Sequence, residues 1–103
     1  MEVKKLRSCE QFDWDQWNTD KIRQKHKVEP YECEEVFFDD DKVILKDVLH
    51  SEQEKRFVLL GKTKKKRLLF LVYTERNHKI RVISARDLNK RERGLYGKTD
   101  KDS

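Results

Sequence analysis

The sequence has little of the residues that build disulfide-linked, membrane-spanning or turn-rich proteins. Its 103 residues include two cysteines, three glycines and one proline. Cys9 and Cys33 have a spacing that matches no zinc or redox motif, so we expect no disulfide. No run of about 18 consecutive apolar residues occurs, and no apolar stretch follows the first residues. We therefore expect a reduced, cytoplasmic protein that does not span a membrane.

Several catalytic motifs are also missing. The sequence contains no glycine-rich phosphate loop, no Gly-x-Ser-x-Gly and no His-Glu-x-x-His. It therefore gives no support for nucleoside-triphosphate, serine-hydrolase or zinc chemistry. The acidic run Asp39-Asp40-Asp41 favours a solvated turn over a Mg²⁺ site. We expect no metal and no cofactor, so an enzyme of this sequence would be one that needs neither.

Charge is what the sequence has in excess. Charged residues make up 44% of the chain and apolar residues 35%, with a net charge of +5. The apolar residues gather in short periodic runs, which predicts a thin core under a solvated surface. The length allows one domain, which we place at residues 1–96, followed by a disordered tail at 97–103. The positive charge favours nucleic acid or an acidic protein as a partner.

The hydrophobic periodicity first predicts helices. Residues 16–26 are expected to form a helix that Asp13 or Asp15 caps. Pro30 suits the first turn of a second helix, because the N–H that proline lacks is not needed there. In that second helix Cys33 shares a face with the apolar residues that follow it, so we expect Cys33 to be a small buried hydrophobe.

The period changes to two in the second half of the chain, which predicts strands. These are expected at residues 43–46, 56–61, 67–74 and 79–86. Short connections favour a twisted antiparallel sheet, and the apolar strand at 67–74 is typical of a central position with helices over at least one face. The last strand runs into a short helix that carries Arg91, Glu92 and Arg93. The sequence therefore predicts an α+β fold with two N-terminal helices and one short C-terminal helix.

The end of the last strand presents arginines. Arg81 and Arg86 belong to this strand, and the planar fork of donors on a guanidinium group fits phosphate. Cations that a strand holds in place form a more credible anion site than cations on a loop. The segment therefore predicts an anion site at this end of the sheet.

Two segments of the chain resemble a family of bacterial toxins. The first is Arg-Val-Ile-Ser-Ala-Arg at residues 81–86, followed by Glu92-Arg93 and Tyr96. The second is Phe12-Asp13-Trp14-Asp15-Gln16-Trp17-Asn18, followed by Lys25-His26, Val28, Pro30 and Glu34-Glu35-Val36-Phe37. With Gly61 and Tyr73-Thr74-Glu75-Arg76 between them, the ordered set spans residues 12–96 and is similar to the BrnT-like toxins. The family usually has glycine after Lys-His, where this chain has Lys27, and this departure leaves the end of the first helix open.

The resemblance implies a RelE-like fold and the activity of a ribonuclease toxin that inhibits growth. It also implies a cognate antitoxin that binds the toxin, neutralises it and recruits it to operator DNA. RNA carries its own nucleophile in the 2′-hydroxyl, so a protein can cleave it by aligning that oxygen, stabilising negative charge and protonating the leaving oxygen. We therefore expect metal-independent RNA cleavage by basic residues. The alternative is a non-catalytic module that binds an antitoxin or nucleic acid.

The candidate catalytic residues are basic or can transfer a proton. Arg81 and Arg86 are assigned to the scissile phosphate, Arg67 and Lys64 to the flanking backbone, and Tyr96 or His26 to proton transfer. The further candidates for RNA binding are Lys65, Lys66, Arg91 and Arg93.

Each candidate also has a structural interpretation. A lysine-rich turn is as often a solvated edge that prevents aggregation. His26 at a helix end favours an interaction with the terminal carbonyls. Tyr96 more often packs than catalyses. Glu92 either pairs with a site arginine and orients it or is one surface charge among many.

Overall fold

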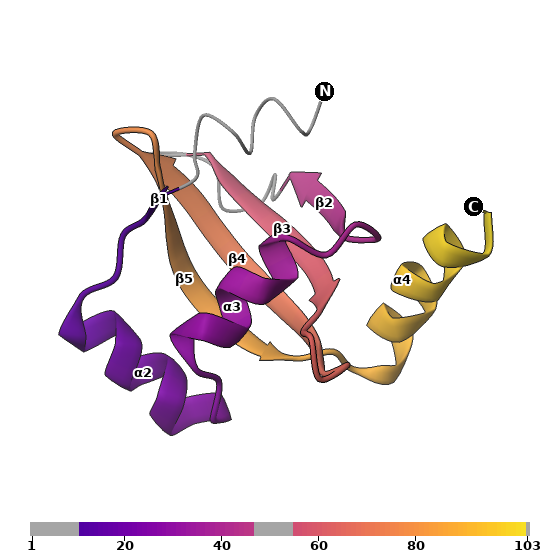
Figure 1. The fold of residues 1–103 in the computed structure, drawn as a ribbon, viewed down its shortest axis with the longest axis horizontal. Coiled ribbons are helices and arrows are strands. Elements are labelled where there is room, and N and C mark those ends of the chain that lie inside the picture. Colours follow the sequence, from indigo (N-terminus) through magenta and orange to yellow (C-terminus); the bar gives the residue numbers. More distant parts are fainter. Residues whose placement is uncertain (1–10, 47–54, 103) are drawn as a thin grey trace.

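The computed structural model describes residues 11–46 and 55–102 and has the α+β fold that the sequence predicts. A five-stranded sheet in the order β1-β5-β4-β3-β2 packs with three helices in these residues (Figure 1). The elements are β1 (Gln11–Phe12), α2 (Gln16–His26), α3 (Pro30–Phe37), β2 (Val43–Lys46), β3 (Arg56–Lys62), β4 (Leu68–Arg76), β5 (Lys79–Asp87) and α4 (Lys90–Asp102). No helix within the described ranges is long and apolar enough to cross a membrane.

The first strand corrects the expectation of a purely antiparallel sheet. The strands β2 to β5 form the expected antiparallel meander, but β1 pairs in parallel with β5, so the sheet is mixed. The partners are Gln11 with Lys79 and Phe12 with Ile80. This position brings the centroid of the Phe12 ring to 5.2 Å from that of Phe37 in α3. A strand of two residues is too short for its hydrophobic periodicity to indicate which strand it pairs with. Contacts between aromatic rings that are distant in sequence help to determine this pairing.

Both ends of α2 follow from local chemistry. Asp15 is the cap, because its Oδ1 accepts a hydrogen bond of 2.7 Å from the backbone N–H of Asn18. The helix ends at His26, and Lys27 adopts the left-handed conformation with φ of 54°. Its N–H donates to the carbonyl of Arg23 at 2.9 Å. Lys27 therefore forms a left-handed cap of the kind that favours glycine, at a conformational cost of about 1 kcal/mol.

The helix α3 packs closely against the sheet. Pro30 occupies its first turn, as expected. Cys33 is fully buried, and burial raises the pKa of its thiol to about 12, which confirms the prediction of a small buried hydrophobe. A Cβ atom at Gly61 of β3 would lie 2.8 Å from the Cβ of Val36. The close approach of α3 to β3 therefore requires glycine at this position.

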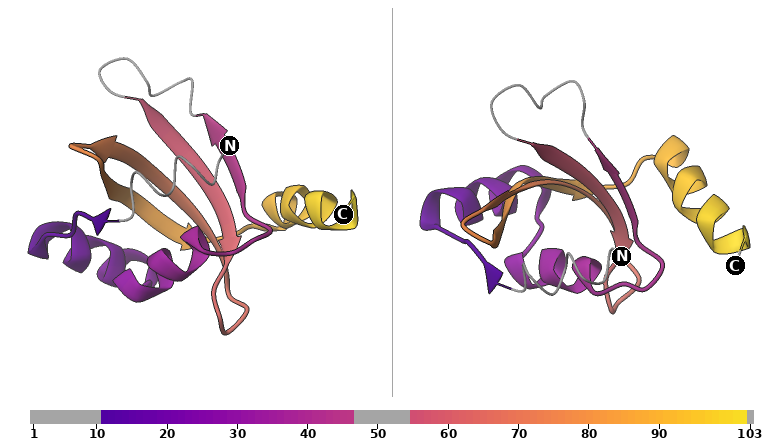
Figure 2. Two further views of the ribbon diagram at one scale, coloured as in Figure 1. Left: turned by 45° about the horizontal axis from the view of Figure 1, so that its top comes forward. Right: turned by 90° about the horizontal axis from the view of Figure 1, so that it is seen from above.

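The two faces of the sheet are covered differently. Leu69, Leu71 and Tyr73 of β4 belong to the main core with residues of α2 and α3. Leu68 and Phe70 point to the opposite side, where they pack on a smaller cluster of Leu60, Leu88 and Tyr96. Figure 2 shows α2 and α3 together on one side of the curved sheet, with α4 away from them at its flank. We call the face opposite α2 and α3 the outer face.

Three expectations stay predictions. The helix α4 continues to Asp102, beyond the residue at which we placed the end of the domain, and the division into a domain and a disordered tail stays a prediction. The RelE-like classification does so as well. Cys9 lies outside the described residues, so the expectation that it forms no disulfide also stays a prediction; Cys33 is a free thiol.

Candidate nucleic-acid interface

A β-bulge in β5 brings two of the predicted site arginines onto one face. Arg81 lies opposite Thr74 of β4, and Arg86 lies opposite Phe70. Residues an odd number of positions apart point to opposite faces of a regular strand. Here the pairing register shifts between the two arginines, which leaves Ile83 as an extra residue. Both arginines therefore project from the outer face.

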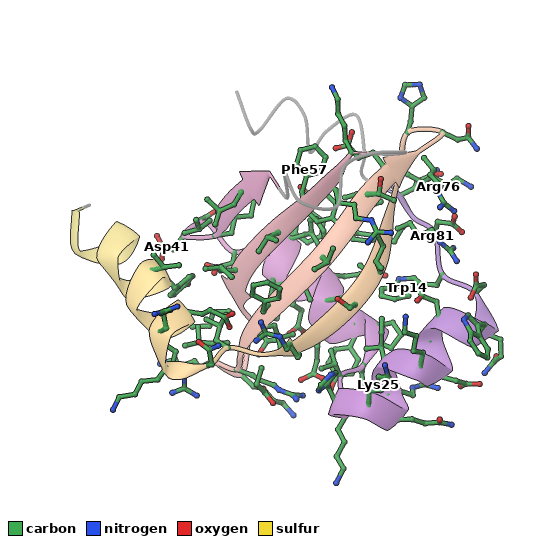
Figure 3. The ribbon with its side chains drawn as sticks, turned by 180° about the vertical axis from the view of Figure 1, so that it is seen from behind. Trp14, Lys25, Asp41, Phe57, Arg76 and Arg81 are labelled. Atoms are coloured by element: carbon green, nitrogen blue, oxygen red, sulfur yellow. The ribbon has the colours of Figure 1, made fainter. Side chains whose placement is uncertain are left out.

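Two aspartates at the start of α2 hold Arg81. Its Nη2 donates to Asp15 at 2.7 Å and its Nη1 to Asp13 at 3.4 Å. The pKa of the Asp15 carboxyl is lowered, first by the N–H of Asn18 and then by the hydrogen bond from Arg81. Figure 3 shows Arg81 beside the segment that carries Trp14. Arg81 thus joins β5 to the start of α2, the helix that covers the other face.

Arg86 forms a bidentate ion pair with Glu92 of α4. The Nη1 and Nη2 atoms donate to the two carboxylate oxygens at 2.8 and 2.7 Å. The guanidinium carbon lies 4.0 Å from the centroid of the Phe70 ring. Glu92 also exchanges hydrogen bonds with Asn89, which caps α4. The pairing of Glu92 with a site arginine is therefore confirmed, and it fixes the start of α4 to the end of β5.

Arg67 joins three elements through one guanidinium group. Its Nε and Nη2 donate to the carboxylate of Asp87 at 2.7 and 3.2 Å. Its Nη1 donates to Glu32 at 3.1 Å and to the carbonyl of Lys27 at 3.0 Å, and Nη2 donates to the carbonyl of His26 at 3.1 Å. These bonds can use all five guanidinium N–H groups. Arg67 therefore connects the end of α2, the start of α3 and the end of β5.

The carboxylate of Asp87 is bound by Arg67 and also feels the charges of two further cations. The hydrogen bond and charge of Arg67 lower the pKa of Asp87, and the charges of His26 and Arg93 lower it further. We call His26, Arg67, Asp87 and Arg93 the Asp87 cluster. Arg86 directly precedes this carboxylate, and its Nη1 donates to the Asp87 carbonyl at 3.1 Å. The fold thus brings four of the predicted site residues together at one end of the sheet.

The predicted lysines directly precede Arg67 of this cluster in the sequence. Lys64, Lys65 and Lys66 are exposed in the turn that leads directly to Arg67, and we call them the lysine turn. Arg91 is exposed in the first turn of α4. The ion pairs between described residues involve none of these four side chains.

Tyr96 does not join the Asp87 cluster. Its hydroxyl donates to Oδ2 of Asp39 at 2.7 Å, and its ring packs with Leu60 and Leu88. The side chain is only 6% exposed. Tyr96 thus attaches α4 to the segment that follows α3. This is the structural role that the sequence offers for Tyr96 as the alternative to catalysis.

Sequence reasoning did not select Asp87, on which the cluster centres. The sequence feature that could have indicated Asp87 is its position directly after Arg86, as a lone carboxylate among basic residues. Within the described ranges, no three side chains of His, Cys, Asp or Glu are grouped so that they could hold a metal ion.

Most of the sequence matches one family of known proteins. A family model described as the ribonuclease toxin BrnT of type II toxin–antitoxin systems matches residues 14–92. The chain belongs to this family. No curated protein matches it. The match includes His26, Arg67, Arg86 and Asp87, and it ends just before Arg93. Membership implies a ribonuclease toxin with a cognate antitoxin as its partner.

Proposed function

We propose that this chain cleaves RNA at the Asp87 cluster without a metal ion. The observation that supports the proposal is the convergence of α2, the β3–β4 turn and the β5–α4 junction on one carboxylate. The charges of His26 and Arg93 act on this carboxylate, Arg86 directly precedes it, and the exposed lysine turn leads directly to Arg67. Clustered cations attract the phosphate backbone of RNA, and arginines stabilise the charge that a phosphate gains during cleavage.

The reaction is an attack by the 2′-hydroxyl of RNA on the adjacent phosphorus. The bond from that oxygen to phosphorus forms as the bond to the 5′-oxygen breaks, and the products are a 2′,3′-cyclic phosphate and a 5′-hydroxyl. Arg93 and Arg86 neutralise the phosphate oxygens, and His26 transfers a proton to or from the reacting oxygens. The lysine turn and Arg91 bind the flanking backbone.

The other predicted site residues receive supporting roles in this proposal. Arg67 is a positioning residue, because its donors already hold Asp87 and the end of α2. Arg81 is a positioning residue as well, because it holds Asp13 and Asp15 at the start of α2. Tyr96 anchors α4. The cognate antitoxin neutralises the toxin in the cytoplasm and recruits it to operator DNA.

One observation favours a second candidate, a non-catalytic module that binds its antitoxin or nucleic acid. Carboxylates of the same chain pair with all three arginines that the sequence assigns to catalysis, Arg67, Arg81 and Arg86. Such pairs stabilise a fold without any catalytic role.

The purified protein distinguishes the two candidates. We expect it to degrade RNA in excess EDTA, to leave 2′,3′-cyclic phosphate ends and to spare DNA, which lacks the 2′-hydroxyl. Loss of activity on chelation would contradict metal independence. RNA binding without cleavage would favour the second candidate.

A further inference from the structure

The outward side of α3 carries an acidic and aromatic stripe. Tyr31, Glu34, Glu35 and Phe38 follow one another at the spacing that places residues on one side of a helix. Tyr31 and Phe38, at the two ends, are 54% and 66% exposed. We call these four residues the α3 stripe. In Figure 1, α3 lies in front of the sheet, on the face opposite the outer face.

The stripe borders a pocket. All four of its residues line this hollow, together with Asp39, Lys62, Thr63 and Lys64. Glu34 accepts a hydrogen bond of 2.9 Å from Nε1 of Trp14, and Glu35 accepts one of 3.0 Å from the N–H of Lys64. Each bond uses one carboxylate oxygen, so both carboxylates are oriented while their second oxygens make no bond to another described residue.

The charge of α3 and of the residues that follow it is opposite to that of the chain as a whole, although Lys62 and Lys64 also line the pocket. Residues 29–41 contain seven carboxylates and no lysine or arginine, in a chain of net charge +5. In the described structure Glu29 and Glu32 pair with arginines, whereas Glu34 and Glu35 form no ion pair with a described residue. Carboxylates repel RNA, so the stripe is unsuited to the ligand proposed for the Asp87 cluster.

We propose that the α3 stripe docks an arginine-bearing basic segment of a protein partner. A guanidinium group binds a carboxylate through paired hydrogen bonds and stacks on aromatic faces. The stripe offers both, with the carboxylates of Glu34 and Glu35 between the rings of Tyr31 and Phe38. Exposed aromatic side chains around a pocket are typical anchors of protein interfaces. This inference does not rest on RNA cleavage, because none of the four stripe residues has a role in that reaction; the pocket shares only Lys64 with the lysine turn.

Synthetic peptides test the charge and the stacking separately. The probe is a short capped peptide that alternates arginine with leucine, and its lysine version is the matched control. Calorimetry with the full chain at low salt should show saturable binding of the arginine peptide. The lysine peptide should bind several-fold more weakly, because it lacks the planar fork. Equal affinity for both peptides, or no saturable binding, would overturn the proposal.

Variants locate the binding. Glu35→Gln keeps an acceptor for Lys64 but removes the charge, and Tyr31→Ala removes a ring; each should weaken the arginine peptide about tenfold. The matched controls Glu75→Gln and Trp17→Ala change an exposed carboxylate and an exposed ring elsewhere, and should leave affinity unchanged. Circular dichroism confirms that each variant is folded. Equal losses in the controls would overturn the assignment.

Two further measurements test other occupants. Sedimentation should show no self-association of the chain that depends on Glu35. Self-association that Glu35→Gln abolishes would identify a second copy of this chain as the occupant and overturn the proposal. RNA binding, measured without the peptide, should be unchanged in Glu35→Gln and Tyr31→Ala. Loss of RNA binding in either variant would overturn the separation of the two surfaces.

Discussion

Arg86 and Glu92 form a bidentate ion pair that joins β5 to α4. The pair raises the pKa of the Arg86 guanidinium and lowers the pKa of the Glu92 carboxyl, because each charge stabilises the other. Glu92 also exchanges reciprocal hydrogen bonds with Asn89, and these cap the start of α4. The same carboxylate therefore orients a candidate phosphate-binding arginine and fixes a helix.

The first prediction separates these two roles of Arg86. We expect Arg86→Ala and Glu92→Ala each to lower the melting temperature, and the double variant to lower it by less than the sum, with a coupling of about 1 to 2 kcal/mol. Thermal unfolding of the three variants measures this. If Arg86 also stabilises the transition state, folded Arg86→Ala should cleave RNA roughly 10² to 10³ more slowly. A wild-type rate in folded Arg86→Ala would leave it only the structural role.

The second prediction concerns Arg67. Arg67→Ala should destabilise the fold by about 3 kcal/mol, because it leaves Asp87, Glu32 and the carbonyls at the end of α2 without their donor. The control is Arg23→Ala, which removes an exposed pair with Glu29 and should cost at most about 1 kcal/mol. Urea unfolding provides both values. Similar losses in the two variants would refute the central position of Arg67.

The third prediction concerns acid. The pKa values of Asp87 and Glu92 lie below their ordinary values of 3.8 and 4.5, chiefly because of hydrogen bonds from Arg67 and Arg86. Below about pH 4.5 the unfolded chain therefore binds more protons than the folded chain. The stabilisation is present at neutral pH and is lost as pH falls through the lowered folded-state values. Asp87→Asn should be less stable than wild type at pH 7, and the difference should shrink as the pH falls. A constant difference in melting temperature would contradict this.

The fourth prediction uses two glycines as a matched pair. Gly61→Ala should cost about 1 to 3 kcal/mol, because the new Cβ meets Val36 at 2.8 Å. Gly94→Ala in α4 meets nothing within 4 Å and should stabilise the chain by up to about 1 kcal/mol. Melting temperatures decide the sign of each change. A neutral Gly61→Ala would show that α3 does not press on β3.

Much of the fold could be predicted because its signals are local. The meander follows from period-two hydrophobicity, and the start of α2 follows from Asp15 as a cap. The parallel pairing of β1 could not be predicted, since Phe12 reaches Phe37 only after the chain has folded. The bulge at Ile83 leaves no mark on the apolar pattern, because the residues around it read as one continuous strand.

The candidate site was predictable in its residue types but not in its arrangement. The basic residues were visible along the chain, and guanidinium chemistry pointed to phosphate. Their carboxylate partners were not visible, because Arg67 reaches Asp87 and Glu32 across 20 and 35 positions of sequence. These contacts decide which cations converge.

The most direct test of the proposed site is the single-turnover cleavage of a fluorescent RNA in excess EDTA. Arg93→Gln should slow the reaction by roughly 10² to 10³ and His26→Gln by roughly 10² to 10⁴, with both variants folded. The control Lys79→Gln removes an exposed cation at the opposite end of β5, about 26 Å from Asp87 by strand geometry, and should leave the rate unchanged. Full activity in both Arg93→Gln and His26→Gln would contradict cleavage at the Asp87 cluster.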